Sequence, residues 1–195
     1  MFGNPDYYNI EKLTEQGLWP YSFLSAYGMI PYLKRAGNDL IGVEIGVLKG
    51  ENIYMLLDQL PNIKKILGID NYEAHTDYDT VRTLEDMKNY EGVAKENLER
   101  FGDRYSLIKE KSIDAAILFE PETIDFILID GDHSYDGVKA DLNAYYPLLK
   151  KGGHMFIHDT FSQDVFNAIS DYRNENKLRM PLNKSKNYVD FWVKP

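Results

Sequence analysis

The segment Ile124–His133 reads IDFILIDGDH and decides the fold. Its first six residues have the length and the β-branched and aromatic content of a buried strand, and DGDH follows as a polar loop. The same order recurs where the strand-like run His154–Ile157 (HMFI) is followed by His158 and Asp159. Asp130 and His158 are 28 residues apart, the length of one strand–helix–strand unit. We therefore expect two parallel strands whose polar ends meet at one edge of a sheet.

Three further runs of the same kind precede this segment. Apolar residues with helical spacing lie between the runs and begin at Ile53, Tyr90 and Val138. Continuous apolar strands that alternate with amphipathic helices favour a parallel sheet covered on both faces. The predicted fold class is α/β, a doubly wound, Rossmann-like, seven-stranded sheet that is mostly parallel and ends in a C-terminal antiparallel hairpin. The three earlier runs are Leu40–Ile45, Lys65–Ile69 and Arg104–Ile108.

The N-terminal part differs from the rest in composition. Residues 1–37 are rich in aromatic side chains and are expected to form a helical segment that acts as a lid or an interface, whereas residues 38–195 form the main domain. Within the first part we expect helices near Ile10–Gln16 and from about Tyr21 to Ala36, the second interrupted by Pro31.

The C-terminal part and one internal loop are predicted as follows. After a helix near Phe161–Asn174, the tail from Tyr188 to Val193 alternates like a strand. The stretch Asn183–Asn187 has the composition of a turn that pairs this tail with Leu178–Leu182. His75, in the loop Asn71–Arg82, is interpreted as a solvated side chain.

Composition excludes several classes of protein. The chain has 195 residues, 44% hydrophobic and 27% charged, as is ordinary for one globular domain. Acidic residues outnumber basic ones by 31 to 22, and a net charge of −9 is the wrong sign for binding nucleic acid or an anionic membrane. With no cysteine, disulfides, thiolate metal sites and cysteine nucleophiles are excluded. Neither a signal-peptide pattern nor an apolar run of roughly 18 residues is present, so we expect a cytoplasmic protein.

Polar residues follow each predicted strand, where ligands bind in open α/β sheets. Glu44 is the last polar residue of the first run, and Gly46 and Gly50 after it permit a tight turn, a close ligand or both. Asp70 follows the second run, where a carboxylate can accept hydrogen bonds from a ribose diol. Ser112 follows the third and is interpreted as a helix N-cap that can also face an adenine.

These motifs carry a family resemblance over residues 38–160. The arrangement E-x-G-x-x-x-G, Asp70, Ser112, IDGDHSYDGVKADL and PLLKKGGHMFIHDT resembles the class I S-adenosylmethionine-dependent methyltransferases. Within that class it is most similar to the macrocin O-methyltransferase and cephalosporin-hydroxylase-like group. The resemblance implies S-adenosylmethionine as cofactor, a small-molecule substrate and, as in many relatives, a homo-oligomer as one option.

The resemblance also implies site residues. The cofactor-binding residues would be Glu44, Gly46, Gly50, Asn52, Asp70, Ser112, Ile113 and Asp130. Asp130 would also be a catalytic residue, and His133 falls where related enzymes place a general base. Asp130, His158 and Asp159 match the positions of a divalent metal site, but relatives mostly have oxygen ligands where this chain has His158. Imidazole suits Mn²⁺ or Fe²⁺ better than Mg²⁺.

Three functions remain open at this stage. The first is O-methylation of a hydroxyl on a sugar-like or natural-product substrate, with His133 as base and Asp130 and Asp159 orienting the oxygen. The second keeps the fold but changes the nucleophile, to N-methylation or another cofactor-dependent reaction. The third is a non-catalytic protein that retains the cofactor pocket, which the presence of Asp130, His133 and Asp159 disfavours.

Overall fold

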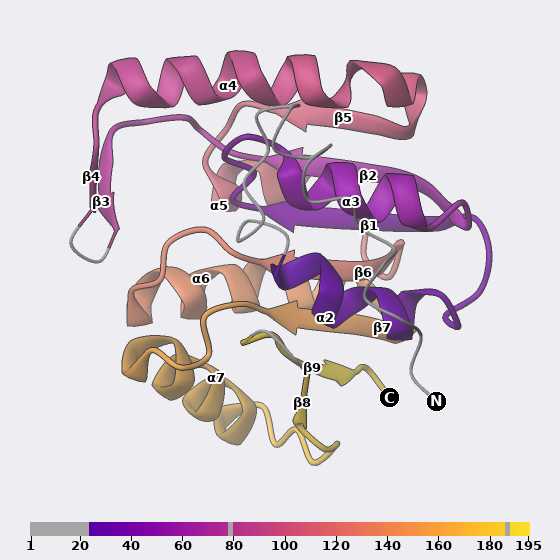
Figure 1. Cartoon of the computed structure of the whole chain (residues 1–195). Helices are drawn as coiled ribbons and strands as arrows, with labels where there is room; N and C mark the ends of the chain where they lie inside the picture. The colour runs from indigo at the N-terminus through magenta and orange to yellow at the C-terminus, as the bar shows by residue number, and fades with distance from the viewer. Residues whose placement is uncertain (1–23, 78–79, 186–187) are drawn as a thin grey trace.

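The computed structural model describes residues 24–77, 80–185 and 188–195, and a seven-stranded sheet forms its centre (Figure 1). The strand order is β5-β2-β1-β6-β7-β9-β8. The first five strands in this order pair in parallel, and β9 pairs antiparallel with both β7 and β8. This confirms the predicted fold class. The strands are β1 Leu40–Ile45, β2 Ile63–Ile69, β5 Tyr105–Ile108, β6 Ile124–Ile129, β7 Leu149–Ile157, β8 Asn183–Lys184 and β9 Asp190–Val193.

Helices cover both faces of the sheet and form two hydrophobic cores. On β6, Phe126 and Leu128 face one core while Ile127 and Ile129 face the other, as expected for a strand buried on both sides. Helices α2, α3 and α4 pack on the first face, and α5, α6 and α7 on the second. The helices are α2 Leu24–Leu33, α3 Glu51–Gln59, α4 Leu84–Leu98, α5 Ser112–Ala115, α6 Tyr135–Tyr145 and α7 Gln163–Glu175.

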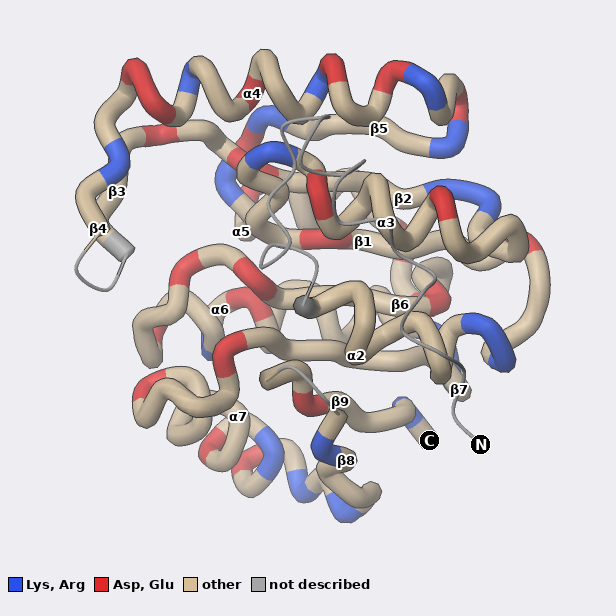
Figure 2. The backbone as a smooth tube through the Cα atoms, in the orientation of Figure 1, with Lys and Arg blue, Asp and Glu red and all other residues tan. Residues whose placement is uncertain are grey.

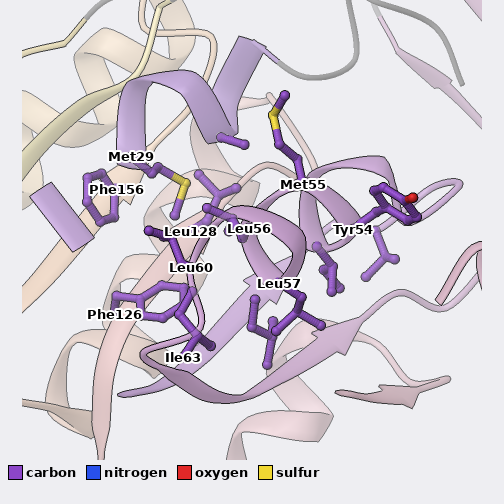
Figure 3. Close-up of a cluster of buried hydrophobic side chains, with 14 of the residues drawn as sticks. Met29, Tyr54, Met55, Leu56, Leu57, Leu60, Ile63, Phe126, Leu128 and Phe156 are labelled. Carbon is purple, nitrogen blue, oxygen red and sulfur yellow. The ribbon is translucent and has the colours of Figure 1, made fainter. Parts of the chain in front are cut away.

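The first core shows how the N-terminal helix is held. Figure 3 shows Met29 of α2 beside Phe156 of β7, with Leu56 of α3 close by. All three side chains are buried. α2 therefore packs directly over the part of the sheet that ends at the candidate site. The helix predicted near Ile10–Gln16 lies outside the described residues, and the division into residues 1–37 and 38–195 stays a prediction.

The antiparallel end of the sheet is confirmed, but the predicted boundaries of the hairpin are wrong. Leu178–Leu182 forms no strand, and β8 instead occupies Asn183–Lys184, which we expected to be turn. Pro181 has no N–H group for a sheet ladder, so pairing starts only after it. β7 begins five residues before the predicted start. Its first residues, LKKGG, are too polar and too rich in glycine to look like a strand, but Leu149 still pairs with Ile124 of β6.

The loop after β2 also contains structure that the sequence did not predict. β3 (His75–Asp77) and β4 (Thr80–Arg82) form a separate two-stranded antiparallel sheet. Figure 1 shows this hairpin projecting at the side of the sheet where the strands end. Among the residues that the structure describes, none belongs to a helix long and apolar enough to cross a membrane.

Candidate functional site

A cavity of about 800 Å³ lies at the carboxyl ends of the parallel strands. Ten of the eleven predicted site residues line it, and Gly50 does not. Figure 2 shows acidic segments gathered at this end of the sheet beside α6, whereas acidic and basic residues alternate along α4. The ten residues are Glu44, Gly46, Asn52, Asp70, Ser112, Ile113, Asp130, His133, His158 and Asp159.

The two glycines after β1 do different things. Gly46 has φ +84°, and a Cβ there would lie 2.0 Å from the backbone oxygen of Asp130, so the loops after β1 and β6 pack backbone against backbone. Gly50 has φ +75° and precedes α3 as its N-cap. A Cβ at Gly50 would meet Leu98 of α4 at 3.0 Å. Gly46 therefore shapes the cavity wall, and Gly50 serves the turn and the packing of α4.

Asp70, at the end of β2, fixes the glycine loop. Its Oδ2 accepts hydrogen bonds from the backbone N–H groups of Val47 and Leu48, both at 3.0 Å. Its Oδ1 accepts one from the Tyr72 N–H at 2.8 Å. Each carboxylate oxygen has two lone pairs, so Oδ1 keeps one for a ligand. The predicted contact with ribose is compatible with this geometry and stays a prediction.

Glu44 and Asn52 form a buried polar pair under the loop. Asn52 Nδ2 donates to Glu44 Oε2 at 2.6 Å, and both side chains are buried. Burial raises the pKa of Glu44 well above its ordinary value, more than the bond from Asn52 lowers it. Asn52 Oδ1 is buried and has no hydrogen-bond partner among the described residues. This acceptor lines the cavity and can take a donor from a ligand.

Ser112 is not the helix N-cap that we expected. Lys111 occupies that position, and Ser112 is the first residue of α5. Its hydroxyl donates to Asp141 Oδ1 at 2.5 Å, and its backbone oxygen accepts from Tyr145 Oη at 2.6 Å. Asp141 also lines the cavity and is only 3% exposed. Burial is the main cause that raises the pKa of Asp141 to about 6.

The ends of β6 and β7 bring two imidazoles and two carboxylates together, as the sequence predicted. His158 Nδ1 lies 3.0 Å from Asp130 Oδ1 and 3.2 Å from Asp159 Oδ1. His133 Nε2 lies 3.4 Å from Asp130 Oδ1 and 3.5 Å from Asp159 Oδ2. Burial alone would raise the pKa of Asp130, but His158 and His133 outweigh it and lower that pKa. Burial likewise acts to lower the pKa of His158, and the attraction of Asp130 and then Asp159 raises it.

The donor atoms of this cluster fit a divalent ion. Asp130, His133 and His158 each offer one ligand atom, all within 4.8 Å of one another. Ligands about 2.1 Å from one ion at right angles lie about 3.0 Å apart, close to the separations seen here. Two imidazoles and a carboxylate suit Mn²⁺ or Fe²⁺ better than Mg²⁺. Asp159, which the sequence placed in the ligand set, lies beside this group rather than in it, so its metal role stays a prediction.

Several residues of the site gave no sequence signal. Ser25 of α2 donates to Asp130 Oδ2 at 3.3 Å, a contact across 105 positions of sequence. His75 is exposed as expected, but it lines the cavity, and its Nε2 lies 3.4 Å from Arg82 Nη1. Asp141 sits inside the amphipathic pattern of α6, where only its polarity at an inward position could have marked it.

Three of the seven non-glycine residues with positive φ in the described part of the chain lie just after strands of the sheet. Leu48, Tyr72 and Asp159 follow β1, β2 and β7, and their φ angles are +50°, +52° and +52°. Residues other than glycine rarely adopt this left-handed region, at a cost of about 1–2 kcal/mol each. Such outliers often accompany functional sites, where the surrounding structure holds them in place.

Known proteins share this fold and sequence pattern. An uncharacterised protein of Acanthamoeba polyphaga mimivirus is 31% identical over 154 residues, or 75% of this chain and 59% of that protein, so the chain spans about three fifths of its relative. The O-methyltransferase NovP superposes with a TM-score of 0.62 at 16% identity, over 98% of this chain and 90% of that one. An O-methyltransferase from Bacillus cereus in complex with SAH gives 0.63 at 15%, over 100% and 93%.

The sequence itself places the chain in a family. The profile described as "Methyltransferase domain" matches residues 43–160, from β1 to the loop after β7. This range holds every predicted site residue, including Glu44 at its start and Asp159 at its end. The structural likeness to NovP and to the Bacillus cereus enzyme, at low identity, agrees in fold. The chain therefore belongs to the methyltransferase domain family and has the fold of the class I S-adenosylmethionine-dependent methyltransferases.

Proposed function

We propose that this protein transfers the methyl group of S-adenosylmethionine to a hydroxyl of a small molecule, with His133 as general base. The observation that carries the proposal is the position of His133 Nε2 between Asp130 and Asp159, at 3.4 and 3.5 Å, in the wall of the cavity. Family membership and the fold support the cofactor. NovP and the Bacillus cereus enzyme, both O-methyltransferases, support oxygen as the methyl acceptor.

Asp130 and Asp159 determine which nitrogen of the His133 imidazole can act as the base. They favour the tautomer with its proton on Nε2, which leaves the lone pair on Nδ1 to accept the proton of the substrate hydroxyl. The resulting imidazolium lies beside both carboxylates, which stabilise it. Methyl transfer is an in-line displacement in which the positive charge leaves sulfur, so the remaining task is to hold oxygen and methyl in line.

A divalent cation fits the same end of the cavity. Asp130, His158 and Asp159 would hold it in this proposal, because a His133 Nε2 that carries a proton toward the two carboxylates has no lone pair for a metal. His133 then stays the base. When bound, such an ion makes the substrate hydroxyl more acidic as a Lewis acid. The Ser25 hydroxyl on Asp130 Oδ2 helps to orient that carboxylate from the side of α2.

The proposal is tested by binding and turnover measured separately. Calorimetric titration with S-adenosylmethionine and S-adenosylhomocysteine, with and without Mn²⁺, should show binding; no heat with either ligand under any condition would overturn the cofactor assignment. A panel of hydroxylated small molecules is then screened by mass spectrometry for transfer of an isotopically labelled methyl group. Methyl groups found only on nitrogen would replace O-methylation by N-methylation.

His133→Ala tests the base. We expect unchanged S-adenosylhomocysteine binding and a loss of about 10²–10⁴-fold in kcat. His154→Gln is the matched control, because His154 lies on β7 outside the cavity lining and stacks on Phe156. His133→Ala protein that works at the full rate would remove His133 from the mechanism.

A further inference from the structure

The β5 end of the cavity, across the sheet from His133 and His158, carries a second group of polar side chains. β5 and β6 are separated by β2 and β1, three strand spacings or about 14 Å. Ser112 and Ile113 lie just after β5, whereas Asp130 and His133 lie just after β6. Under the proposed function the sulfonium methyl must point to the β6 end. The nucleobase, at the other end of the cofactor, then lies toward β5.

Ser112 and Asp141 meet at this β5 end. The Ser112 hydroxyl donates to Asp141 Oδ1 at 2.5 Å, and Tyr145 Oη holds the Ser112 backbone oxygen at 2.6 Å. Both Ser112 and Asp141 line the cavity. Ile113 adds an apolar surface that is 45% exposed, suited to the face of a heterocycle. Two neighbours from α6 therefore hold Ser112: Asp141 takes the hydroxyl proton, and Tyr145 fixes the backbone.

The Ser112–Asp141 hydrogen bond determines whether this end of the cavity offers hydrogen-bond donors or acceptors to a ligand. A serine hydroxyl has one proton and two lone pairs, and an ionised carboxylate only accepts. With its proton given to Asp141, Ser112 Oγ can only accept from a ligand, and so can Asp141. A ligand atom that meets this pair must carry an N–H, as the exocyclic amine of adenine does. A carbonyl oxygen at the same place would face lone pairs with no donor.

We propose that Asp141 is the positioning residue that makes Ser112 select the amino group of adenine over the carbonyl oxygen of hypoxanthine. The inference rests on the proposed cofactor and deepens it, because it assigns base specificity to a residue outside the predicted site. Asp141 acts through Ser112 and need not touch the base itself. Loss of one hydrogen bond to a charge-assisted pair corresponds to a preference of about 10-fold to about 100-fold.

The experiment compares two ligands on one protein. Calorimetry gives the Kd of S-adenosylhomocysteine and of S-inosylhomocysteine, which carries the carbonyl oxygen in place of the amine. The wild-type protein is expected to prefer the adenine ligand by about 10-fold or more. Equal affinities would overturn the inference while leaving the proposed function intact. Binding of neither ligand would overturn both.

Two variants then isolate Asp141. In Asp141→Asn the new amide can donate to Ser112 Oγ, which frees the hydroxyl proton for a carbonyl, so the preference should fall by about 10-fold. Ser112→Ala should also abolish the preference. Asp136→Asn, an acid-to-amide change at an exposed position of the same helix, should keep it. A purely structural role for Asp141 would weaken both ligands equally, and an unchanged ratio in Asp141→Asn would refute the assignment.

Discussion

Replacing Asp141 by Asn is expected to stabilise the folded protein at neutral pH and to change it little in acid. Asp141 is 3% exposed, and burial raises its pKa from the ordinary 3.8 to about 6. Each pKa unit corresponds to about 1.4 kcal/mol, so the buried charge costs the folded state about 3 kcal/mol at pH 7.5. For a chain of this length, that is about 6–12 °C in Tm.

The direction in which stability changes with pH follows from proton binding by Asp141. Between about pH 4 and pH 6 the folded state holds the Asp141 proton while the unfolded state has lost it, so stability falls as pH rises through this window. Below about pH 4 both states are protonated and the cost disappears. Asn at this position does not titrate. The gain in stability of the variant over the wild type should therefore grow by about 2 kcal/mol between pH 4.5 and pH 7.5.

Urea unfolding followed by tryptophan fluorescence measures this difference, since Trp192 is fully buried in the second core. The Asp136→Asn control, an acid-to-amide change at an exposed position of the same helix, should not gain about 3 kcal/mol at pH 7.5. A gain for Asp141→Asn that is equally large at pH 4.5 and pH 7.5 would refute the account. So would a variant that is less stable at pH 7.5, because Asp141 would then be stabilising rather than costly.

Three further outcomes are expected. Gly46→Ala should cost about 2–4 kcal/mol in urea unfolding, because its Cβ would strike the Asp130 backbone oxygen, whereas Gly92→Ala, at an exposed helical position with open space, should stabilise the protein by up to about 1 kcal/mol. Mn²⁺ should bind more tightly than Mg²⁺ by calorimetry and lose affinity in Asp130→Asn; tighter Mg²⁺ binding would exclude imidazole ligands. The preference for adenine over hypoxanthine should shrink from pH 8 to pH 5.5, because protonated Asp141 can donate to Ser112; a constant ratio would contradict this.

The parallel sheet and the β6–β7 cluster were predictable because their signals are local. A buried strand such as Ile124–Ile129 is a continuous apolar run, and the residue that follows it lies at the sheet edge wherever the chain goes next. The spacing of one strand–helix–strand unit then brought Asp130 and His158 within 3.0 Å. Such inferences need only the period of the pattern and the handedness of the crossover.

The features of the site that could not be predicted from the sequence depend on contacts between distant segments. Ser112 looked like an N-cap, and its actual partner Asp141 lies 29 residues further on, inside α6. Ser25 reaches Asp130 only because α2 packs over the sheet. The C-terminal hairpin was placed from residue preferences, but Pro181 shifted the pairing to Asn183–Lys184. In each case a tertiary partner decides the role, and no local pattern specifies that partner.

The acidic lining of the cavity affects both the cofactor and the methyl acceptor in the proposed reaction. Among the described residues that line it, nine carry carboxyl groups, against one arginine and one lysine, Arg82 and Lys111. Such a field favours a cationic sulfonium over the neutral thioether left after transfer, so it helps cofactor binding and product release in the proposed reaction. The same field opposes an oxyanion on the acceptor. In the proposed reaction this oxygen would lie beside His133 and His158, whose imidazoles would offset the acidic field and allow the hydroxyl to lose its proton.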